Sequence, residues 1–422
     1  MRSRAALLFV GIQFVGLTGC GGEQPSPAGA PDAAPEAEAG ALAPAWELSF
    51  ESAVGAGEED TLCQYFVVPP GGLWVQRFEH TLSDRSHHLL LLPTALSAEQ
   101  IPAPGVIHAC GEGSPLKHTT GGVLYGGQPG GTSVSFPDGS ALRLEAGRVV
   151  LLEHHVVNTG SAPIATRASL KLVSAVAVPE REAGIMHFYN WAIFVPPRGE
   201  GRAEMTCEVG EDVELSFGHG HMHERGTLFL AEIVEGNERA PLFETRDWDA
   251  ETVSFGEARV RAGSHIRFGC SYRNSDDVPY FQGQSATTDE MCSLTLGYVS
   301  QSGRRLANAY EWCTTHASGV VGVGQLSCQA VDRCSEDAWR LARAGQGDGS
   351  GSALQTCFNQ GCDSAPRRFR ALSLCRAARC EAACGVAPGS GGLALSARDD
   401  AACVACLTQS CATEQAACDD AC

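Results

Sequence analysis

Residues 149–157 read Val-Val-Leu-Leu-Glu-His-His-Val-Val, a short β-like run. Runs of this kind recur from about Trp46 to Cys313, broken by Gly and Pro, the residues that mark turns. Their spacing is typical of antiparallel β-sandwiches. The other runs are Cys63–Val68, His88–Leu92, Leu170–Val178, Val213–Phe217, Thr227–Val234 and Cys292–Val299.

The chain as a whole is predicted to be mainly β. We expect two tandem antiparallel, jelly-roll-like β-sandwich domains over 46–180 and 181–315, because the stretch Val-Pro-Glu-Arg-Glu-Ala-Gly at 178–184 looks like a domain boundary. With 422 residues, the chain is long enough for two or three domains.

The composition changes after Cys313. Residues 328–422 hold 12 of the 19 cysteines, and the residues between them mostly favour helix. Several gaps of three or four residues place cysteines on one helical face. We therefore predict a small disulfide-rich helical domain over 316–422. A zinc site at Cys403 and Cys406 is the alternative, but this pair has no partner pair at ribbon-like spacing.

The N-terminus is typical of an exported protein. Arg2 and Arg4 precede an apolar run over 5–15 and then Leu-Thr-Gly-Cys20, the pattern of a signal peptide. The last four residues resemble the bacterial lipobox, which implies a signal peptide over 1–19 and acylation of Cys20; an ordinary secretory signal is the alternative. Removing Cys20 leaves 18 cysteines, an even number that could pair fully.

Residues 20–45 contain little besides Gly, Pro, Ala and Glu, so we expect a disordered tether. This interpretation places the protein in the bacterial cell envelope, lipid-anchored on the periplasmic or the outer-membrane and extracellular face. The cysteine count likewise indicates an oxidising compartment. No apolar window of membrane-spanning length follows the N-terminus, so membrane contact is expected only through the lipid.

Charge excludes one class of function. The net charge of −19 argues against binding DNA or RNA, because phosphate contacts need clustered Lys and Arg. The Gly-Gly runs at 121–131 also lack the Lys-Ser/Thr of a phosphate-binding loop.

The 13 histidines fall partly into clusters. In a strand, His221 and His223 point to the same face, where two imidazoles would repel when protonated and a borderline-soft cation would be coordinated instead. The pairs His87-His88 and His154-His155 are weaker evidence, because strand neighbours face opposite ways unless the backbone bends. Imidazoles combined with a thioether such as Met291 suit copper, whereas structural zinc prefers thiolates and calcium prefers carboxylates.

A series of motifs in one order along the chain resembles a known family. The motifs resemble those of the ascorbate-dependent copper type II monooxygenases, which include peptidylglycine α-hydroxylating monooxygenase and dopamine β-monooxygenase. The resemblance covers about 46–313, and the gaps between ligand groups are regular: 155 − 88 = 67, 221 − 155 = 66 and 291 − 223 = 68. Such gaps fit two similar domains, each supplying one metal site. The motifs are Cys63 with Tyr65-Phe66, His87-His88-Leu-Leu-Leu, Glu153-His154-His155 with Asn158, His221-x-His223-x-x-Gly226, and Ser285-x-x-x-Asp289-Glu290-Met291-Cys292.

The resemblance implies two coppers per chain. An electron-transfer copper would be held by His87, His88 and His155. A catalytic copper, held by His221, His223 and Met291, would bind O2 and hydroxylate a C–H bond. Two alternatives remain open: His154 in place of His155, and His219 in place of His223. The family spacings to Asn158 and Gly226 favour His155 and His223.

The resemblance also implies a substrate pocket and three disulfides. His219, Ser293 and Thr295 stand at positions where the peptide-amidating branch binds its substrate with Arg, Asn and Tyr, which makes peptide amidation doubtful. A small amine, an aromatic or a lipid-derived molecule would all fit. The implied disulfides are Cys63–Cys110, Cys207–Cys313 and Cys270–Cys292. The histidines without motif context, treated as ordinary polar residues, are His80, His108, His118, His187, His265 and His316.

The leading hypothesis is a copper-dependent monooxygenase that hydroxylates a small molecule with O2 and a reductant such as ascorbate. A non-catalytic copper store or chaperone on the same fold is the first alternative. A structural or adhesive surface lipoprotein, in which the cysteine-rich region does the work, is the second.

Overall fold

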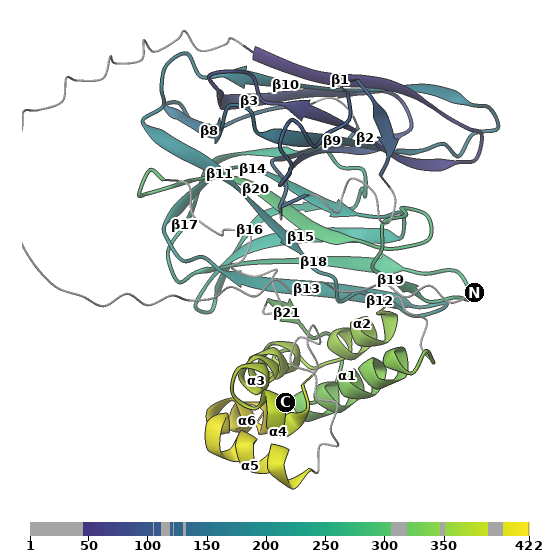
Figure 1. The fold of residues 1–422 in the computed structure, drawn as a ribbon, viewed down its shortest axis with the longest axis vertical. Helices are drawn as coiled ribbons and strands as arrows, with labels where there is room; N and C mark the ends of the chain where they lie inside the picture. Colours follow the sequence, from purple (N-terminus) through teal and green to yellow (C-terminus); the bar gives the residue numbers. More distant parts are fainter. Residues whose placement is uncertain are drawn as a thin grey trace, which may run out of the picture. The chain divides into compact units, whose positions relative to one another are not determined.

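The computed structural model describes residues 45–103, 105–110, 119–120, 122–129, 132–304, 319–346, 351–386, 400–420 and 422. The fold is mainly β, with two tandem β-sandwiches and a disulfide-rich helical C-terminal region, as the sequence predicts (Figure 1). The predicted signal peptide, Cys20 and the predicted tether up to residue 44 lie outside the described residues.

The first sandwich packs two sheets around an aliphatic and aromatic core that includes Leu48, Phe78 and Leu152. In β10, alternate residues are buried, so that Leu170 and Leu172 face the core. One sheet runs β1 (Ala45–Val54), β10 (Ile164–Ser174), β3 (Leu73–Leu82) and β8 (Ser140–Leu144), with β7 (Ser133–Ser135) paired to β3; the other runs β5 (Ile107–Ala109), β2 (Glu59–Val67), β9 (Val149–Val157), β4 (Ser86–Pro93) and β6 (Tyr125–Gly127).

The second sandwich has its own core, which includes Phe229, Phe268 and Leu294. β12 (Phe194–Val195) and β19 (Tyr280–Phe281) form a separate two-stranded antiparallel sheet. One group of strands is β11 (Arg181–Tyr189), β20 (Cys292–Ser300), β14 (Val213–Met222) and β17 (Val253–Val260); the other sheet is β16 (Glu238–Thr245), β15 (Gly226–Glu235), β18 (His265–Arg273), β13 (Glu200–Glu208) and β21 (Val320–Val321).

The two sandwiches are joined through a shared sheet. Strand β8 of the first pairs with β11 of the second, so that β1, β10, β3, β8, β11, β20, β14 and β17 follow one another in one sheet. This pair is parallel, with Arg181 opposite Ser140, whereas the sequence predicted antiparallel pairing. Although β11 follows β10 directly in the sequence, it lies beside β8 in the sheet and not beside β10.

Each predicted strand overlaps an observed one, but several bounds differ. The run Leu170–Val178 is shifted, because β10 begins earlier, at Ile164, and ends earlier, at Ser174, and Val176 and Val178 are exposed ahead of Pro179. The run Val213–Phe217 is too short, because β14 continues to Met222. This extension matters for the site, because it places His219 and His221 in a buried strand.

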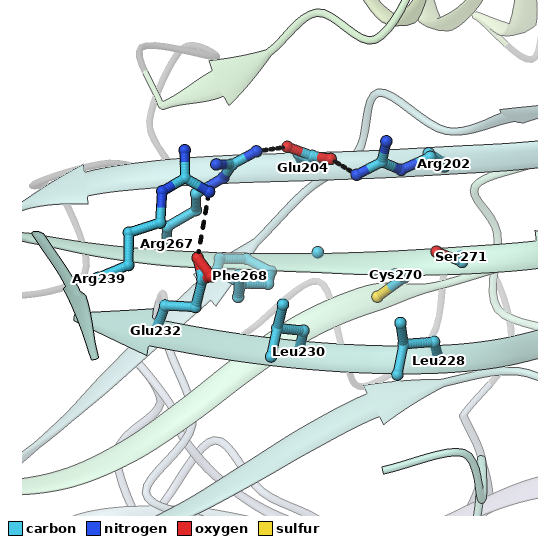
Figure 2. Close-up of a pocket in the computed structure, with 11 residues that line it drawn as sticks. Arg202, Glu204, Leu228, Leu230, Glu232, Arg239, Arg267, Phe268, Cys270 and Ser271 are labelled. Atoms are coloured by element: carbon cyan, nitrogen blue, oxygen red, sulfur yellow. Dashed lines mark hydrogen bonds and ion pairs between the residues drawn. The ribbon is translucent and has the colours of Figure 1, made fainter. Parts of the chain in front are cut away.

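A shallow pocket of about 120 Å³ lies over strands β13, β15 and β18 (Figure 2). Arg202 and Arg267 both contact the carboxylate of Glu204, and Arg239 pairs with Glu232. The pocket's carboxylates are thus paired with its arginines.

The C-terminal region is a set of short helices cross-linked by disulfides. Ser327 caps the first helix by accepting a hydrogen bond from the backbone N–H of Ala330. The helices are α1 (Cys328–Arg343), α2 (Ser352–Asn359), α3 (Ala365–Arg379), α4 (Glu381–Cys384), α5 (Ala401–Ser410) and α6 (Ala412–Asp419). None of the helices in the described part of the chain has the length and apolar character needed to cross a membrane.

All 12 cysteines of this region are paired, so Cys403 and Cys406 lie in separate disulfides and the zinc alternative is wrong. A disulfide sulfur is not a thiolate and cannot serve as the zinc ligand that was considered. The pairs are Cys328–Cys418, Cys334–Cys357, Cys362–Cys422, Cys375–Cys411, Cys380–Cys406 and Cys384–Cys403.

Candidate metal centre

Three histidines of the first sandwich converge at one end of neighbouring strands. His88 on β4 lies directly opposite His155 on β9, with 5.0 Å between ring centroids. The β4–β9 register shifts between Ser86 and His88, and such a bulge bends a strand locally. As a result the adjacent residue His87 also reaches the group, with its ring 4.8 Å from His88 and 5.2 Å from His155.

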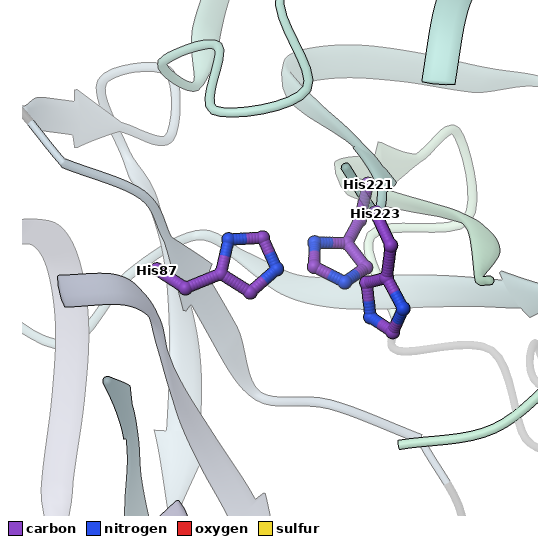
Figure 3. Close-up of side chains that lie close together, drawn as sticks. All are labelled: His87, His221 and His223. Carbon is purple, nitrogen blue, oxygen red and sulfur yellow. The ribbon is translucent and has the colours of Figure 1, made fainter. Parts of the chain in front are cut away.

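Two histidines of the second sandwich join the same group. His221 near the end of β14 and His223 just after it lie 5.3 Å apart between ring centroids. The His87 ring lies 4.9 Å from His221 and 5.6 Å from His223 (Figure 3). All five histidines of this group, which we call the histidine cluster, are buried.

The cluster contains two sets of three side chains whose candidate ligand atoms lie within 4.8 Å of one another. One set is His87, His88 and His155, and the other is His87, His221 and His223. The first set is the one the sequence predicted. The sequence predicted one separate site per domain, whereas His87 of the first sandwich belongs to both sets in the structure.

Each ring of the cluster uses one nitrogen to contact a neighbouring polar group. The Nδ1 atom of His87 lies 2.9 Å from Asp249 Oδ1, His88 Nε2 lies 3.2 Å from Glu153 Oε1, and His155 Nε2 lies 2.8 Å from Glu59 Oε1. Nδ1 of His223 lies 3.2 Å from the carbonyl oxygen of Asp289, and Nδ1 of His221 lies 3.1 Å from Gln128 Nε2. Outer partners of this kind orient histidines that bind metals.

In four of these five rings the opposite nitrogen lacks such a contact. Among the described residues, His87 Nε2, His88 Nδ1, His221 Nε2 and His223 Nε2 are buried and have no hydrogen-bond partner. A buried polar atom without a partner costs free energy, about 1–3 kcal/mol. A cation placed among these atoms would satisfy all four, so the donor set fits a metal.

Burial keeps four rings of the cluster neutral, those of His87, His88, His221 and His223. Desolvation is the main cause that lowers the pKa of His87, His88 and His221 well below the ordinary value, and repulsion from the neighbouring histidines adds to it. Burial likewise lowers the pKa of His223 to about 3. Neutral imidazoles keep the lone pairs that a metal requires.

The carboxyl groups around the cluster differ in their environment. Burial raises the pKa of Glu153 to about 7 and, with a contribution from Asp247, that of Asp249 to about 7. Although burial also raises the pKa of Glu59, hydrogen bonds from His155, Thr287, Ser285 and the Ala286 backbone lower it to about 2. Glu59 is therefore a carboxylate at neutral pH, which makes the surroundings attractive to a cation.

A cavity of about 290 Å³ adjoins the cluster. His88, His221 and Met291 line it, together with the three predicted substrate-pocket residues His219, Ser293 and Thr295. The register of β14 and β20 explains this grouping, because His219 lies opposite Thr295 and His221 lies opposite Ser293. Two of the three predicted catalytic ligands, His221 and Met291, thus line the same cavity as the predicted pocket residues.

The structure places the alternative ligand residues in different surroundings. His155 belongs to the cluster, whereas His154 Nε2 lies 2.8 Å from Ser86 Oγ and its ring packs edge-on against Phe50. His223 belongs to the cluster, whereas His219 lines the cavity and both its ring nitrogens are buried without a partner among the described residues.

Met291 is held from two sides. The hydroxyl group of Tyr272 donates a hydrogen bond to the Met291 carbonyl oxygen at 2.8 Å. The next residue, Cys292, forms the predicted disulfide with Cys270. The predicted disulfide Cys63–Cys110 is also present, while Cys313, the predicted partner of Cys207, lies outside the described residues.

Several residues of the site were not predicted. His187, treated as an ordinary polar residue, lines the cavity, and its Nδ1 lies 2.9 Å from Thr295 Oγ1. His80, treated in the same way, contacts Tyr125 and the backbone of Gln128. Both histidines stand alone in the sequence, so no motif pointed to them. Glu59, Gln128 and Asp249, which contact histidines of the cluster, likewise belong to no histidine motif.

Comparisons with known proteins add a coarse likeness of fold. No family model and no curated protein matches the chain. Among solved structures, the major capsid protein P2 from bacteriophage PM2 is similar at 11% identity over 61% of this chain and 97% of that chain, with a TM-score of 0.25. The tandem CBM22 domains of Paenibacillus barcinonensis Xyn10C are similar at 11% identity over 59% of this chain and 80% of that chain, with a TM-score of 0.17.

Proposed function

We propose that the protein is a copper-dependent monooxygenase that hydroxylates a C–H bond of a small molecule. The observation that carries the proposal is the set of four buried, unpartnered imidazole nitrogens, each on a ring whose other nitrogen contacts a neighbouring polar group. Imidazoles suit copper, and a weak thioether ligand would favour Cu(I). Met291 lines the cavity that His88 and His221 also line, which supports its part in the ligand set.

The residues have separate tasks in this proposal. His87, His88 and His155 would hold an electron-transfer copper, and His221, His223 and Met291 would hold a catalytic copper. When bound, copper would supply the redox chemistry that uses O2, two electrons from a reductant such as ascorbate, and two protons to form one hydroxylated product and one water. The chain's own residues position the ligands and exclude water from them.

The cavity indicates the class of substrate. Its lining includes Leu90, Leu92 and Val123, and among the described residues that line it there is no lysine or arginine. Ser293 and Thr295, both on β20, present hydroxyl groups to the cavity. We therefore expect a small substrate without a negative charge, because a carboxylate buried here would lack a cationic partner.

A copper store or chaperone remains the second candidate. The deep burial of the cluster favours metal retention, which a store needs. A cavity beside the ligands, by contrast, is a feature that an enzyme needs and a store does not.

Copper content of the full chain, measured by elemental analysis after loading and dialysis, tests the metal site. We expect two coppers in the wild type and loss of one in His88→Ala and in Met291→Ala, with His265→Ala as the matched control outside the cluster. No retained copper in the wild type would overturn both the enzyme and the store. Ascorbate-dependent O2 uptake across a panel of small amines and aromatics then separates the two, since a store binds copper without sustained uptake.

A further inference from the structure

Three neighbouring strands of the second sandwich present a row of polar side chains to the cavity. In the register of these strands, His187 on β11 lies opposite Thr295 on β20, and Thr295 lies opposite His219 on β14. Directly opposite residues of antiparallel strands point to the same face of a sheet. All three line the cavity, and we call them the polar row. His187, which belongs to none of the sequence motifs, thus stands in line with two of the predicted pocket residues.

A second row lies two residues along the same strands. Tyr189 on β11 is opposite Ser293 on β20, which is opposite His221 on β14, and these residues also line the cavity. The rings of His219 and His221 are 6.2 Å apart between centroids. The polar row is therefore set back from the proposed ligand His221 by one pair of residues. A molecule whose polar group lies on the polar row can extend its carbon skeleton toward His221.

His219 is the member of the polar row with unused hydrogen-bonding capacity. It is 3% exposed, and both its ring nitrogens are buried without a partner among the described residues. The other two members already contact each other, with His187 Nδ1 2.9 Å from Thr295 Oγ1. A neutral imidazole carries one N–H donor and one acceptor nitrogen, and leaving them buried without partners is unfavourable. A bound polar group would relieve this cost.

The rest of the lining limits the charge of that group. The first sandwich contributes the apolar side chains Leu90, Leu92 and Val123. Among the described lining residues there is no lysine or arginine, and the single carboxyl group is that of Glu153 on β9, which contacts His88 at 3.2 Å. An anionic group on the polar row would thus meet no cation there, and a cationic group would meet no carboxylate in the row.

We propose that the polar row binds the uncharged head group of the substrate, a carboxamide or a hydroxyl group, while the apolar part of the molecule packs against Leu90, Leu92 and Val123. The identity of this ligand as a substrate rests on the proposed function. A carboxamide or a hydroxyl group both donates and accepts hydrogen bonds, so it pairs with an imidazole nitrogen of His219 and stays neutral. A charged group would lose its hydration without gaining a counter-ion in the row.

Binding of three matched ligands to the metal-free full chain tests the proposal. Cyclohexylacetamide, cyclohexylacetate and cyclohexylethylamine share one apolar ring and differ in the charge of the head group. Ligand-observed NMR titrations at pH 7.5 give their dissociation constants. We expect the amide to bind roughly tenfold or more tightly than either charged ligand, because burial of an unpaired charge is unfavourable.

Variants of the polar row identify where the amide binds. In His219→Leu we expect the affinity for the amide to fall by roughly 3- to 10-fold, the effect of losing one hydrogen bond. His219→Gln keeps a donor and an acceptor and should restore most of the affinity, which separates recognition from misfolding. His187→Leu should also weaken binding, because Thr295 Oγ1 loses its contact. His265→Leu, on β18 and outside the cavity, is the control.

Three results would overturn the proposal. The first is equal or tighter binding of the acetate or the amine, and tighter binding of the amine would assign the head group to Glu153 instead of the polar row. The second is an amide affinity that does not change in His219→Leu. The third is failure of all three ligands to bind the wild type. Because these titrations use the metal-free protein, their outcome is separate from the copper content that tests the proposed function.

Discussion

Glu59 Oε1 lies 2.8 Å from Nε2 of His155, and this carboxylate also binds the loop that leads to Met291. It accepts hydrogen bonds from Ser285 Oγ at 2.8 Å, the Ala286 backbone N–H at 2.6 Å and Thr287 Oγ1 at 2.7 Å. One side chain on β2 therefore connects a histidine of the first sandwich to the methionine-bearing loop of the second.

We expect Glu59→Ala to weaken copper binding by roughly 10- to 100-fold, the usual effect of removing an outer partner of a metal ligand. The reason is that both His155 and the loop over 285–287 lose their common anchor. Competition with a copper chelator of known affinity measures the change. Glu58→Ala is the matched control, because this exposed neighbour binds only the nearby Gly55 N–H in the described structure. Equal affinities for the two variants would contradict the anchoring role.

Acid should destabilise the metal-free protein. Burial lowers the pKa of His187 to about 4 and that of His219 to about 3, whereas an unfolded histidine titrates near 6.5. Below pH 6.5 the unfolded chain therefore binds protons that the folded chain does not, and each such histidine removes about 1.4 kcal/mol of stability per pH unit until its folded pKa is reached. The raised pKa values of Glu153 and Asp249, both about 7, and of Glu290, about 8, act in the opposite direction. The histidines with lowered pKa are more numerous: His80, His87, His88, His154, His187, His219, His221 and His223.

Urea unfolding at pH 7.5 and pH 5.5 measures this effect. The free energy of unfolding of the metal-free chain should fall by several kcal/mol between the two (about 1.4 kcal/mol per pH unit for each net proton). His219→Gln should reduce the slope by about one proton. A stability that rises toward pH 5.5 would show that the carboxyl groups dominate.

The helical region contacts the wall of the cavity. Gln355 on α2 accepts a hydrogen bond from the Gln282 backbone N–H at 2.8 Å, and the side chain of Gln282 donates to the hydroxyl group of Tyr189, a residue that lines the cavity. We expect Gln355→Ala to cost about 1–3 kcal/mol, because Gln282 N–H loses its partner, and to increase amide exchange over 282–291. Gln360→Ala, at an exposed position just after the same helix, is the control. Unchanged exchange in Gln355→Ala would mean that α2 does not support the loop.

The sequence predicted the fold class, the histidines of the cluster and the two described sandwich disulfides, because each leaves a local or family-specific pattern. It did not predict that His87 joins both ligand sets, because that depends on how β4 and β14 approach each other in space. The parallel β8–β11 pair was not predicted for the same reason, because the sequence of a strand does not show which strand it pairs with. Asp249 and Glu59 were missed because a single carboxylate in a turn or at a strand end looks like any surface residue until the partner ring is placed beside it.

Buried ion pairs join helices α1 and α3 of the C-terminal region, and their contribution to stability can be tested. Arg376 on α3 is almost fully buried and binds Asp332 at 2.9 Å and Glu336 at 3.0 Å, both on α1. Removing one partner of a buried ion pair leaves uncompensated charge and typically costs 3–5 kcal/mol. We expect a loss of about this size in Arg376→Leu, measured by thermal unfolding with the disulfides intact.

Arg367→Leu on the same helix is the matched control, because its pair with Asp363 is exposed and should contribute no more than about 1 kcal/mol. Replacing Asp332, Glu336 and Arg376 together by apolar residues should recover most of the lost stability, since none of these three charges is then left buried without its partner. If the triple variant were as unstable as Arg376→Leu, the cost would come from lost packing between α1 and α3 and not from the unpaired carboxylates.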